Sequence, residues 1–135
     1  MIVACDGASR GNPGPSGIGV QIATEDGSVL AEIARGIGEA TNNVAEYTAV
    51  IEGLQRAQEL GARTVTLRSD SQLLINQLTG RYRVKSEHLQ PLHHRALSIA
   101  AGFRGISFDH VPREENSEAD RLANEGVDRW LAGER

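Results

Sequence analysis

Residues 64–80 read TVTLRSDSQLLINQLTG, and this stretch decides the fold. Val65 and Leu67 alternate with polar residues, which predicts a strand over residues 64–69. After Asp70 the apolar residues recur at helical spacing until Gly80, which predicts a short helix. A strand that leads directly into a helix is typical of a βα unit, whose strand pairs with a parallel neighbour. The stretch therefore favours an α/β fold.

The part of the chain before this stretch predicts three strands and a long helix. A short apolar run over residues 2–5 is followed by Asp6-Gly7 and a loop rich in Gly and Pro. Residues 17–24 and 29–36 flank an Asp-Gly pair, the strongest short signal for a β-hairpin. From Asn43 the apolar spacing changes to three and four, and Gly61 is placed to end a helix.

The part after the stretch predicts a helix over residues 89–101, a strand over 106–111 and a last helix over 117–131. The order is thus βββαβααβα, in which the two hairpin strands are antiparallel to each other and the strand over 64–69 requires a parallel neighbour. A length of 135 residues fits one domain, residues 1–135.

Composition excludes several classes of protein. With 39% hydrophobic and 24% charged residues, the chain resembles an ordinary globular protein rather than a disordered one. A net charge of −4 excludes a uniformly basic nucleic-acid binder, so a polyanion must be held locally. One cysteine, Cys5, allows no intrachain disulfide, and no run of 18 apolar residues is present. We expect a cytoplasmic monomer without membrane contact.

Four acidic residues stand at the ends of predicted elements. Asp6 ends the first strand, Asp70 ends the strand over 64–69, and Glu46 and Asp120 lie in the first turns of two helices. Each has a structural explanation when taken alone. Asp6 could form a turn and Asp70 could cap a helix. Glu46 and Asp120 each stand three residues after a good N-cap residue, as in a capping box.

Taken together, these acids indicate a metal site. The carboxyl ends of parallel strands meet at one edge of a sheet, so Asp6 and Asp70 should lie close together. Crowded carboxylates repel one another unless a cation neutralises them, and oxygen ligands without His or Cys suit Mg²⁺ or Mn²⁺. Two such ions about 3.5–4 Å apart can activate water and stabilise the leaving oxygen in phosphoryl displacement.

Four segments resemble the motifs of type 1 ribonuclease H, in order and across nearly the whole chain. They are DGASRGNPG at 6–14, TNNVAE at 41–46, SDSQ at 69–72 and NSEAD at 116–120. The resemblance implies the ribonuclease H-like fold, a mixed five-stranded sheet flanked by helices. It also implies that Asp6, Glu46, Asp70 and Asp120 bind two Mg²⁺ or Mn²⁺ ions. The implied reaction is hydrolysis of the RNA strand of an RNA/DNA hybrid to 5′-phosphate and 3′-hydroxyl ends.

The same resemblance implies contacts with the substrate. Gly11, Asn12 and Gln72 match positions near the readout of the 2′-hydroxyl, which distinguishes RNA from DNA. Thr41 and Asn42 match a pocket for a DNA-strand phosphate at a helix start. Turn formation, an exposed helix position and ordinary helix entry are the competing explanations for these residues.

The chain departs from the family pattern between its second and third helices. Only residues 81–88 stand where some members carry a basic protrusion that grips the hybrid. Arg81, Arg83 and Lys85, with Tyr82 among them, form the nearest substitute. We expect this group, the basic strip, to contact the DNA strand; a solvated loop is the alternative.

A second departure concerns histidine. Many members have a histidine in the loop before the last helix, but residues 111–116 contain none. The alternation of the preceding strand places His110 inside that strand on its apolar side. Arg113 and Glu114 are better placed to assist, Arg113 toward phosphate and Glu114 toward metal or water. A solvated charge pair is the alternative.

Two competing functions remain at this point. A non-catalytic module that binds hybrid or double-stranded RNA could use the same fold, although the presence of all four acids argues against it. A nuclease or integrase-like enzyme acting on DNA could share the acids, although the motifs around Asn12 and Gln72 argue against that. Neither a dinucleotide-binding GxGxxG at a helix start nor a P-loop is present, so we expect no nucleotide cofactor.

Overall fold

The computed structural model describes residues 1–133 of the chain. The predicted order of strands and helices is confirmed, with one additional 3₁₀ turn. The elements are β1 (Ile2–Ser9), β2 (Gly14–Ala23), β3 (Val29–Ala40), α1 (Asn42–Glu59), β4 (Thr64–Ser69), α2 (Gln72–Leu78), α3 (Gln90–Ala100), β5 (Gly105–His110), η1 (Arg113–Glu115) and α4 (Ser117–Leu131).

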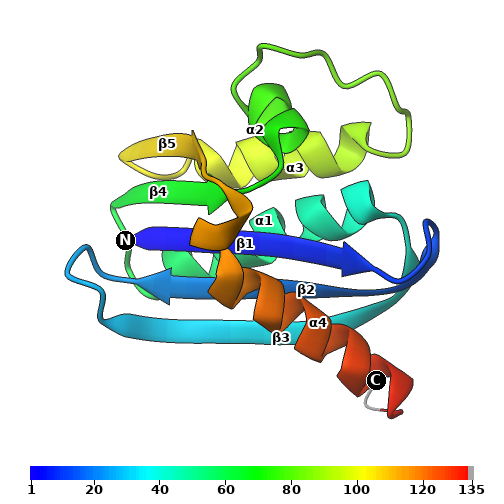
Figure 1. Ribbon diagram of the computed structural model, residues 1–135. Helices are drawn as coiled ribbons and strands as arrows, with labels where there is room; N and C mark the ends of the chain where they lie inside the picture. The colour runs from blue at the N-terminus through cyan, green and yellow to red at the C-terminus, as the bar shows by residue number, and fades with distance from the viewer. Residues whose placement is uncertain (134–135) are drawn as a thin grey trace.

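The strands form one mixed sheet in the order β3-β2-β1-β4-β5 (Figure 1). The pairs β1/β2 and β2/β3 are antiparallel, whereas β1/β4 and β4/β5 are parallel. The predicted mixed five-stranded sheet is therefore confirmed. The strand of the βα unit at residues 64–80 is β4. It lies beside β1 and parallel to it, as a βα unit requires.

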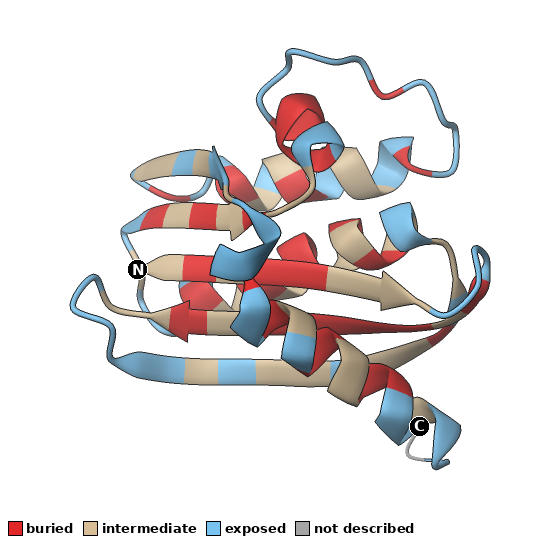
Figure 2. Ribbon diagram, in the orientation of Figure 1, coloured by how far each residue is buried: buried red, intermediate tan, exposed pale blue. Residues whose placement is uncertain are grey.

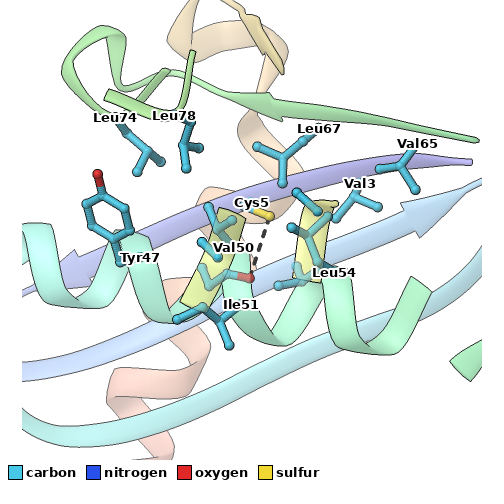
Figure 3. Packing of buried hydrophobic residues seen from close by; sticks show 14 of the residues in the cluster. Val3, Cys5, Tyr47, Val50, Ile51, Leu54, Val65, Leu67, Leu74 and Leu78 are labelled. Atoms are coloured by element: carbon cyan, nitrogen blue, oxygen red, sulfur yellow. Dashed lines mark hydrogen bonds between the residues drawn. The ribbon is translucent and has the colours of Figure 1, made fainter. Parts of the chain in front are cut away.

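Helices cover both faces of the sheet. In Figure 1, α1 lies behind the sheet and α4 crosses in front of β1, β2 and β3. Figure 2 colours the buried residues of these strands and helices red. Figure 3 shows Val50, Ile51 and Leu54 of α1 packed against Val3 and Leu67 of the sheet. This apolar layer fixes α1 against β1 and β4.

The other helix, α4, packs unusually close to the sheet. A Cβ atom at Gly19 would lie 2.1 Å from the carbonyl oxygen of Ala119, and one at Gly17 would lie 2.5 Å from that of Ala123. Gly19 is the register partner of Asp6. Glycine is therefore required at these two positions of β2, since a side chain would push α4 away from β1.

The structure moves one predicted boundary that matters for the site. β1 continues to Ser9 instead of ending at Asp6, because pairing with β2 runs on through Asp6↔Gly19 to Ser9↔Ser16. The Asp6-Gly7 pair is thus extended backbone and not a turn. Among residues 1–133, no helix is both long and apolar enough to span a membrane.

Candidate active site

A cavity of about 650 Å³ opens where β1 and β4 separate. The two strands pair only as far as Ala4↔Arg68. Beyond that register the gap is bordered by α1, η1 and α4. Asp6, Glu46, Asp70 and Asp120 all line this cavity, each from a different segment of the chain. Gly7 allows β1 and α1 to approach each other closely, because a Cβ atom at Gly7 would lie 2.4 Å from the backbone nitrogen of Glu46.

None of these four acids serves as a cap or a turn former. The N-cap of α1 is Thr41, whose side chain accepts from the backbone N–H of Val44, so Glu46 lies one turn further on. The N-cap of α2 is Ser71 and not Asp70. The N-cap of α4 is Asn116, so Ser117 and Asp120 do not form a capping box. The structural explanations weighed for the single residues are therefore wrong.

Burial and mutual repulsion shift the protonation of two of the acids. Asp6 is only 8% exposed. Burial, the charge of Asp70 and a hydrogen bond with the Asp120 carboxyl together raise the pKa of Asp6 to about 8. Burial also raises the pKa of Glu46 to about 7, against a hydrogen bond from Ser71 that lowers it. The site holds protons at neutral pH unless a cation replaces them.

The donor set suits a hard divalent cation. All four side chains are carboxylates, which are ligands for such ions, and burial together with the charge of Asp70 raises the pKa of Asp6 and Glu46. Within residues 1–133, no group of three or more His, Cys, Asp or Glu side chains is arranged so that it could hold a metal ion as it stands. The carboxylates therefore border an open cavity rather than a ready-made coordination sphere.

Of the residues expected to contact the substrate, Asn42 lines this cavity, whereas Gly11, Asn12, Thr41 and Gln72 do not. The side-chain oxygen of Asn12 accepts from the Asn42 backbone N–H at 3.1 Å, and Thr41 caps the same helix. Gly11 has a φ of 96°, as a turn requires. Gln72 begins α2 and is exposed. Turn and helix-entry roles thus apply to Gly11, Asn12 and Thr41, whatever else they bind.

A second cavity of about 510 Å³ adjoins the start of α1. It is lined by Asn12 and Thr41 on one side and by Ser86, His88 and Leu89 of the α2–α3 loop on the other. The basic strip belongs to the same loop: Arg81, Arg83 and Lys85 are exposed, and the side chain of Tyr82 is 55% exposed. Within residues 1–133, the three cations make no ion pair.

Of the two auxiliary candidates, Arg113 lines the 650 Å³ cavity, whereas Glu114 is exposed and does not line it. The prediction for His110 is partly wrong. Its register partner is Ser69, so it lies on the predicted side of β5, but it is the last residue of the strand and is exposed. Its Nε2 lies 3.3 Å from the backbone oxygen of Asp70. The strand ends before the apolar layer can cover it.

Sequence reasoning missed several residues that line the cavity. Ser71 and Asn124 are the clearest cases. Asn124 stands one helical turn after Asp120, and its side chain donates to the Asp120 carbonyl at 3.0 Å. That spacing of four residues was a usable signal. The approach of Ser71 to Glu46 depends on how α1 and α2 pack, and no pattern in the sequence indicates it.

Comparison with known proteins places this arrangement among nucleases. A family model described as reverse transcriptase-like matches residues 4–126. The N-terminal ribonuclease H domain of Rv2228c from Mycobacterium tuberculosis is 47% identical, with a TM-score of 0.91 over 94% of this chain and 98% of that one. Ribonuclease H1 from Halobacterium salinarum is 45% identical, with a TM-score of 0.92 over 94% and 96%.

The chain belongs to the reverse transcriptase-like family, and the relatives that it resembles within that family are ribonucleases H. One of them, LC11-RNase H1, is solved in complex with an RNA/DNA hybrid; it is 42% identical, with a TM-score of 0.91 over 96% of this chain and 98% of that one. The chain spans 35% of the length of the mycobacterial bifunctional protein that it matches.

Proposed function

We propose that this chain is an endoribonuclease that hydrolyses the RNA strand of RNA/DNA hybrids, leaving 5′-phosphate and 3′-hydroxyl ends. The observation that carries the proposal is the convergence of Asp6, Glu46, Asp70 and Asp120 on one open cavity. The hybrid bound to LC11-RNase H1 supports this choice of substrate, since that relative covers nearly the whole chain.

The four carboxylates are the proposed ligands of two Mg²⁺ or Mn²⁺ ions. When bound, such ions lower the pKa of a water and stabilise the leaving oxygen. The chain itself supplies oxygen ligands from rigid elements, with Asp6 inside a paired strand and Asp120 on a helix that packs closely against β2. Ion binding must displace the protons that Asp6 and Glu46 hold at neutral pH.

Substrate contacts are proposed on three sides of the cavity. Gly11, Asn12 and Gln72 read the 2′-hydroxyl, and Thr41 and Asn42 hold a DNA-strand phosphate near the start of α1. The basic strip supplies the remaining phosphate contacts. Since the chain carries a net charge of −4, we expect binding of the hybrid to be weak and strongly dependent on salt.

Arg113 is the proposed auxiliary residue, because its side chain lines the cavity close to the acids. It is placed to contact a phosphate of the substrate. Glu114 is proposed as a transient partner for metal or water, with weaker support, because it lies outside the cavity lining. We further propose that residues 1–135 act as one domain and as a monomer in the cytoplasm.

The decisive experiment incubates the protein with labelled RNA/DNA hybrid, RNA duplex and DNA duplex, each with Mg²⁺, Mn²⁺ or EDTA. We expect cleavage of the RNA strand of the hybrid alone, and none in EDTA. Asp70→Asn should abolish cleavage, while Asp109→Asn, which changes an exposed carboxylate outside the cavity, should not. Cleavage of DNA duplex would favour the integrase-like alternative, and binding without cleavage would favour the non-catalytic module.

A further inference from the structure

We propose that Asn116 is a positioning residue that holds Asp6 and Asp120 at a fixed separation. Asn116 does not line the cavity of the four carboxylates. It lies just behind it, between β1 and the start of α4. This inference rests on the proposed function, because it assigns a role in assembling the same site.

The first step in the argument is the gap in the sheet. The backbone carbonyl of Met1 accepts from Thr66 of β4, and the two-residue repeat of a strand directs the Cys5 carbonyl toward the same side. Pairing with β4 stops at Ala4, so β4 offers Cys5 no partner. The Nδ2 of Asn116 donates to this carbonyl at 2.9 Å. The side chain of Asn116 thus continues the hydrogen bonding of β1 at the residue before Asp6.

The second step is the backbone of Asn116. Its carbonyl accepts from the N–H of Asp120 at 3.1 Å, the first helical bond of α4. Its own N–H donates to the carbonyl of Arg113 at 2.9 Å. One buried residue, 2% exposed, therefore connects the backbone next to Asp6 with the backbone of two other residues that line the cavity.

The third step is the cost of this arrangement. Asn116 occupies the N-cap of α4, where an Asn side chain normally accepts a hydrogen bond from the first turn and stabilises the helix. Here its side chain makes no capping bond. Its Oδ1 is also one of two buried side-chain polar atoms, with Nε of Arg68, that have no hydrogen-bond partner within residues 1–133. Helix stability alone would favour a capping side chain, so the bond to β1 is the feature that this position serves.

The consequence is geometric. Without the donor, the Cys5 carbonyl is left unpaired and the start of α4 is no longer tied to β1. Asp6 and Asp120 both line the cavity and stand on the two segments that Asn116 joins, so the separation of their carboxyls depends on this tie. A shift of about 1 Å at a reacting centre can lower the rate about 100-fold. Binding of the hybrid should change little, because the basic strip and the pocket at α1 lie on other elements.

The test compares Asn116→Ala and Asn116→Leu, the latter close to Asn in size but unable to donate. Val127→Ala is the matched control, because Val127 is fully buried on the same helix and takes no part in the hydrogen bond between Asn116 and Cys5. Four quantities are measured: the Tm, the kcat and KM on the hybrid at saturating Mg²⁺, and the Mn²⁺ affinity by calorimetry without substrate.

We expect both Asn116 variants to lose about 10- to 100-fold in kcat, with KM within about twofold, and to bind Mn²⁺ at least about fivefold more weakly. Val127→Ala should lower the Tm with kcat and Mn²⁺ affinity within about twofold. The proposal is overturned if either Asn116 variant keeps wild-type kcat and Mn²⁺ affinity. It is equally overturned if Val127→Ala lowers kcat by as much as an Asn116 variant that has the same Tm.

A measurement on the unmodified protein covers the case in which both variants fail to fold. The side-chain amide resonance of Asn116 should shift when Mg²⁺ is added, because this amide is hydrogen-bonded to the residue before Asp6, one of the proposed ligands. A side-chain amide resonance of Asn116 that stays fixed while that of Asn124 shifts would overturn the proposal. If the wild-type protein binds Mn²⁺ through an Asn116-dependent site but does not cut the hybrid, the proposed function fails and this inference stands.

Discussion

Asp6→Asn should stabilise the metal-free protein at alkaline pH and leave its stability nearly unchanged at acidic pH. The folded state raises the pKa of Asp6 from 3.8 to about 8, so the folded protein favours the protonated side chain. The stability gained from this proton is fully present below pH 3.8 and is lost as the pH rises through about 8. Above that pH, folding must bury a carboxylate, a penalty that asparagine avoids.

The magnitude follows from the two pKa values. The difference between a pKa of 3.8 in the unfolded protein and about 8 in the folded protein corresponds to a loss of at most about 6 kcal/mol in the free energy of unfolding. Part of this is offset because water and the surrounding side chains rearrange around a buried charge. We therefore expect Asp6→Asn to raise the free energy of unfolding by about 2 kcal/mol at pH 8.5. For a domain of this size, such a gain raises the Tm by about 7 °C.

The assay is thermal unfolding followed by circular dichroism in EDTA at pH 4.5 and pH 8.5. Asp109→Asn, which changes an exposed carboxylate outside the cavity, is the control and should show no such pH dependence. Mg²⁺ should raise the Tm of the wild type at pH 8.5 and have a much smaller effect on Asp6→Asn. An equal Tm difference at both pH values, or a less stable Asp6→Asn protein at pH 8.5, would refute the reasoning.

Three further predictions concern α4, the auxiliary residue and the basic strip. Gly19→Ala should lower both Tm and kcat, because its Cβ would lie 2.1 Å from the Ala119 carbonyl, whereas Gly105→Ala, with its nearest neighbour at 3.6 Å, should change neither in thermal unfolding and steady-state assays. Arg113→Ala should reduce turnover more than His110→Ala. The reverse ranking would assign the auxiliary role to His110, if the histidine variant alone also lost the limb of the pH–rate profile near pKa ~6.5. Replacing Arg81, Arg83 and Lys85 by alanine should mainly raise KM and reduce the slope of log affinity against log salt by up to about 3; an unchanged slope would mean that the strip does not contact the hybrid.

Periodicity predicted the elements well because most of them bury a single face. The strand over 64–69 and the helix over 117–131 have the bounds that the apolar pattern indicates. The prediction was wrong at two places, the end of β1 and the burial of His110. β1 runs through Asp6-Gly7 because β2 pairs with it, although Asp-Gly normally favours a turn. His110 has the expected parity, but the core ends before it.

The candidate site was predictable to the extent that it depends on the ends of elements. Asp6 and Asp70 could be placed together because parallel neighbours bring their carboxyl ends to one edge. Asn116 stands in a quoted motif, yet its role depends on where β1 and β4 stop pairing, which involves positions over 60 residues apart in sequence. The bond from Ser71 to Glu46 likewise depends on packing between two helices. Such contacts between distant segments leave no periodic signal.

The position of Asp120 on α4 has a consequence for synthesis of the chain. Asp6 lies in the first strand and Asp120 in the last helix, so the cavity gains its fourth carboxylate only when α4 packs over Gly17 and Gly19. A nascent chain with α4 still inside the ribosomal exit tunnel can form much of the sheet but not the complete acidic cluster. The proposed nuclease would thus stay inactive until α4 has left the exit tunnel of the RNA-rich machine that makes it.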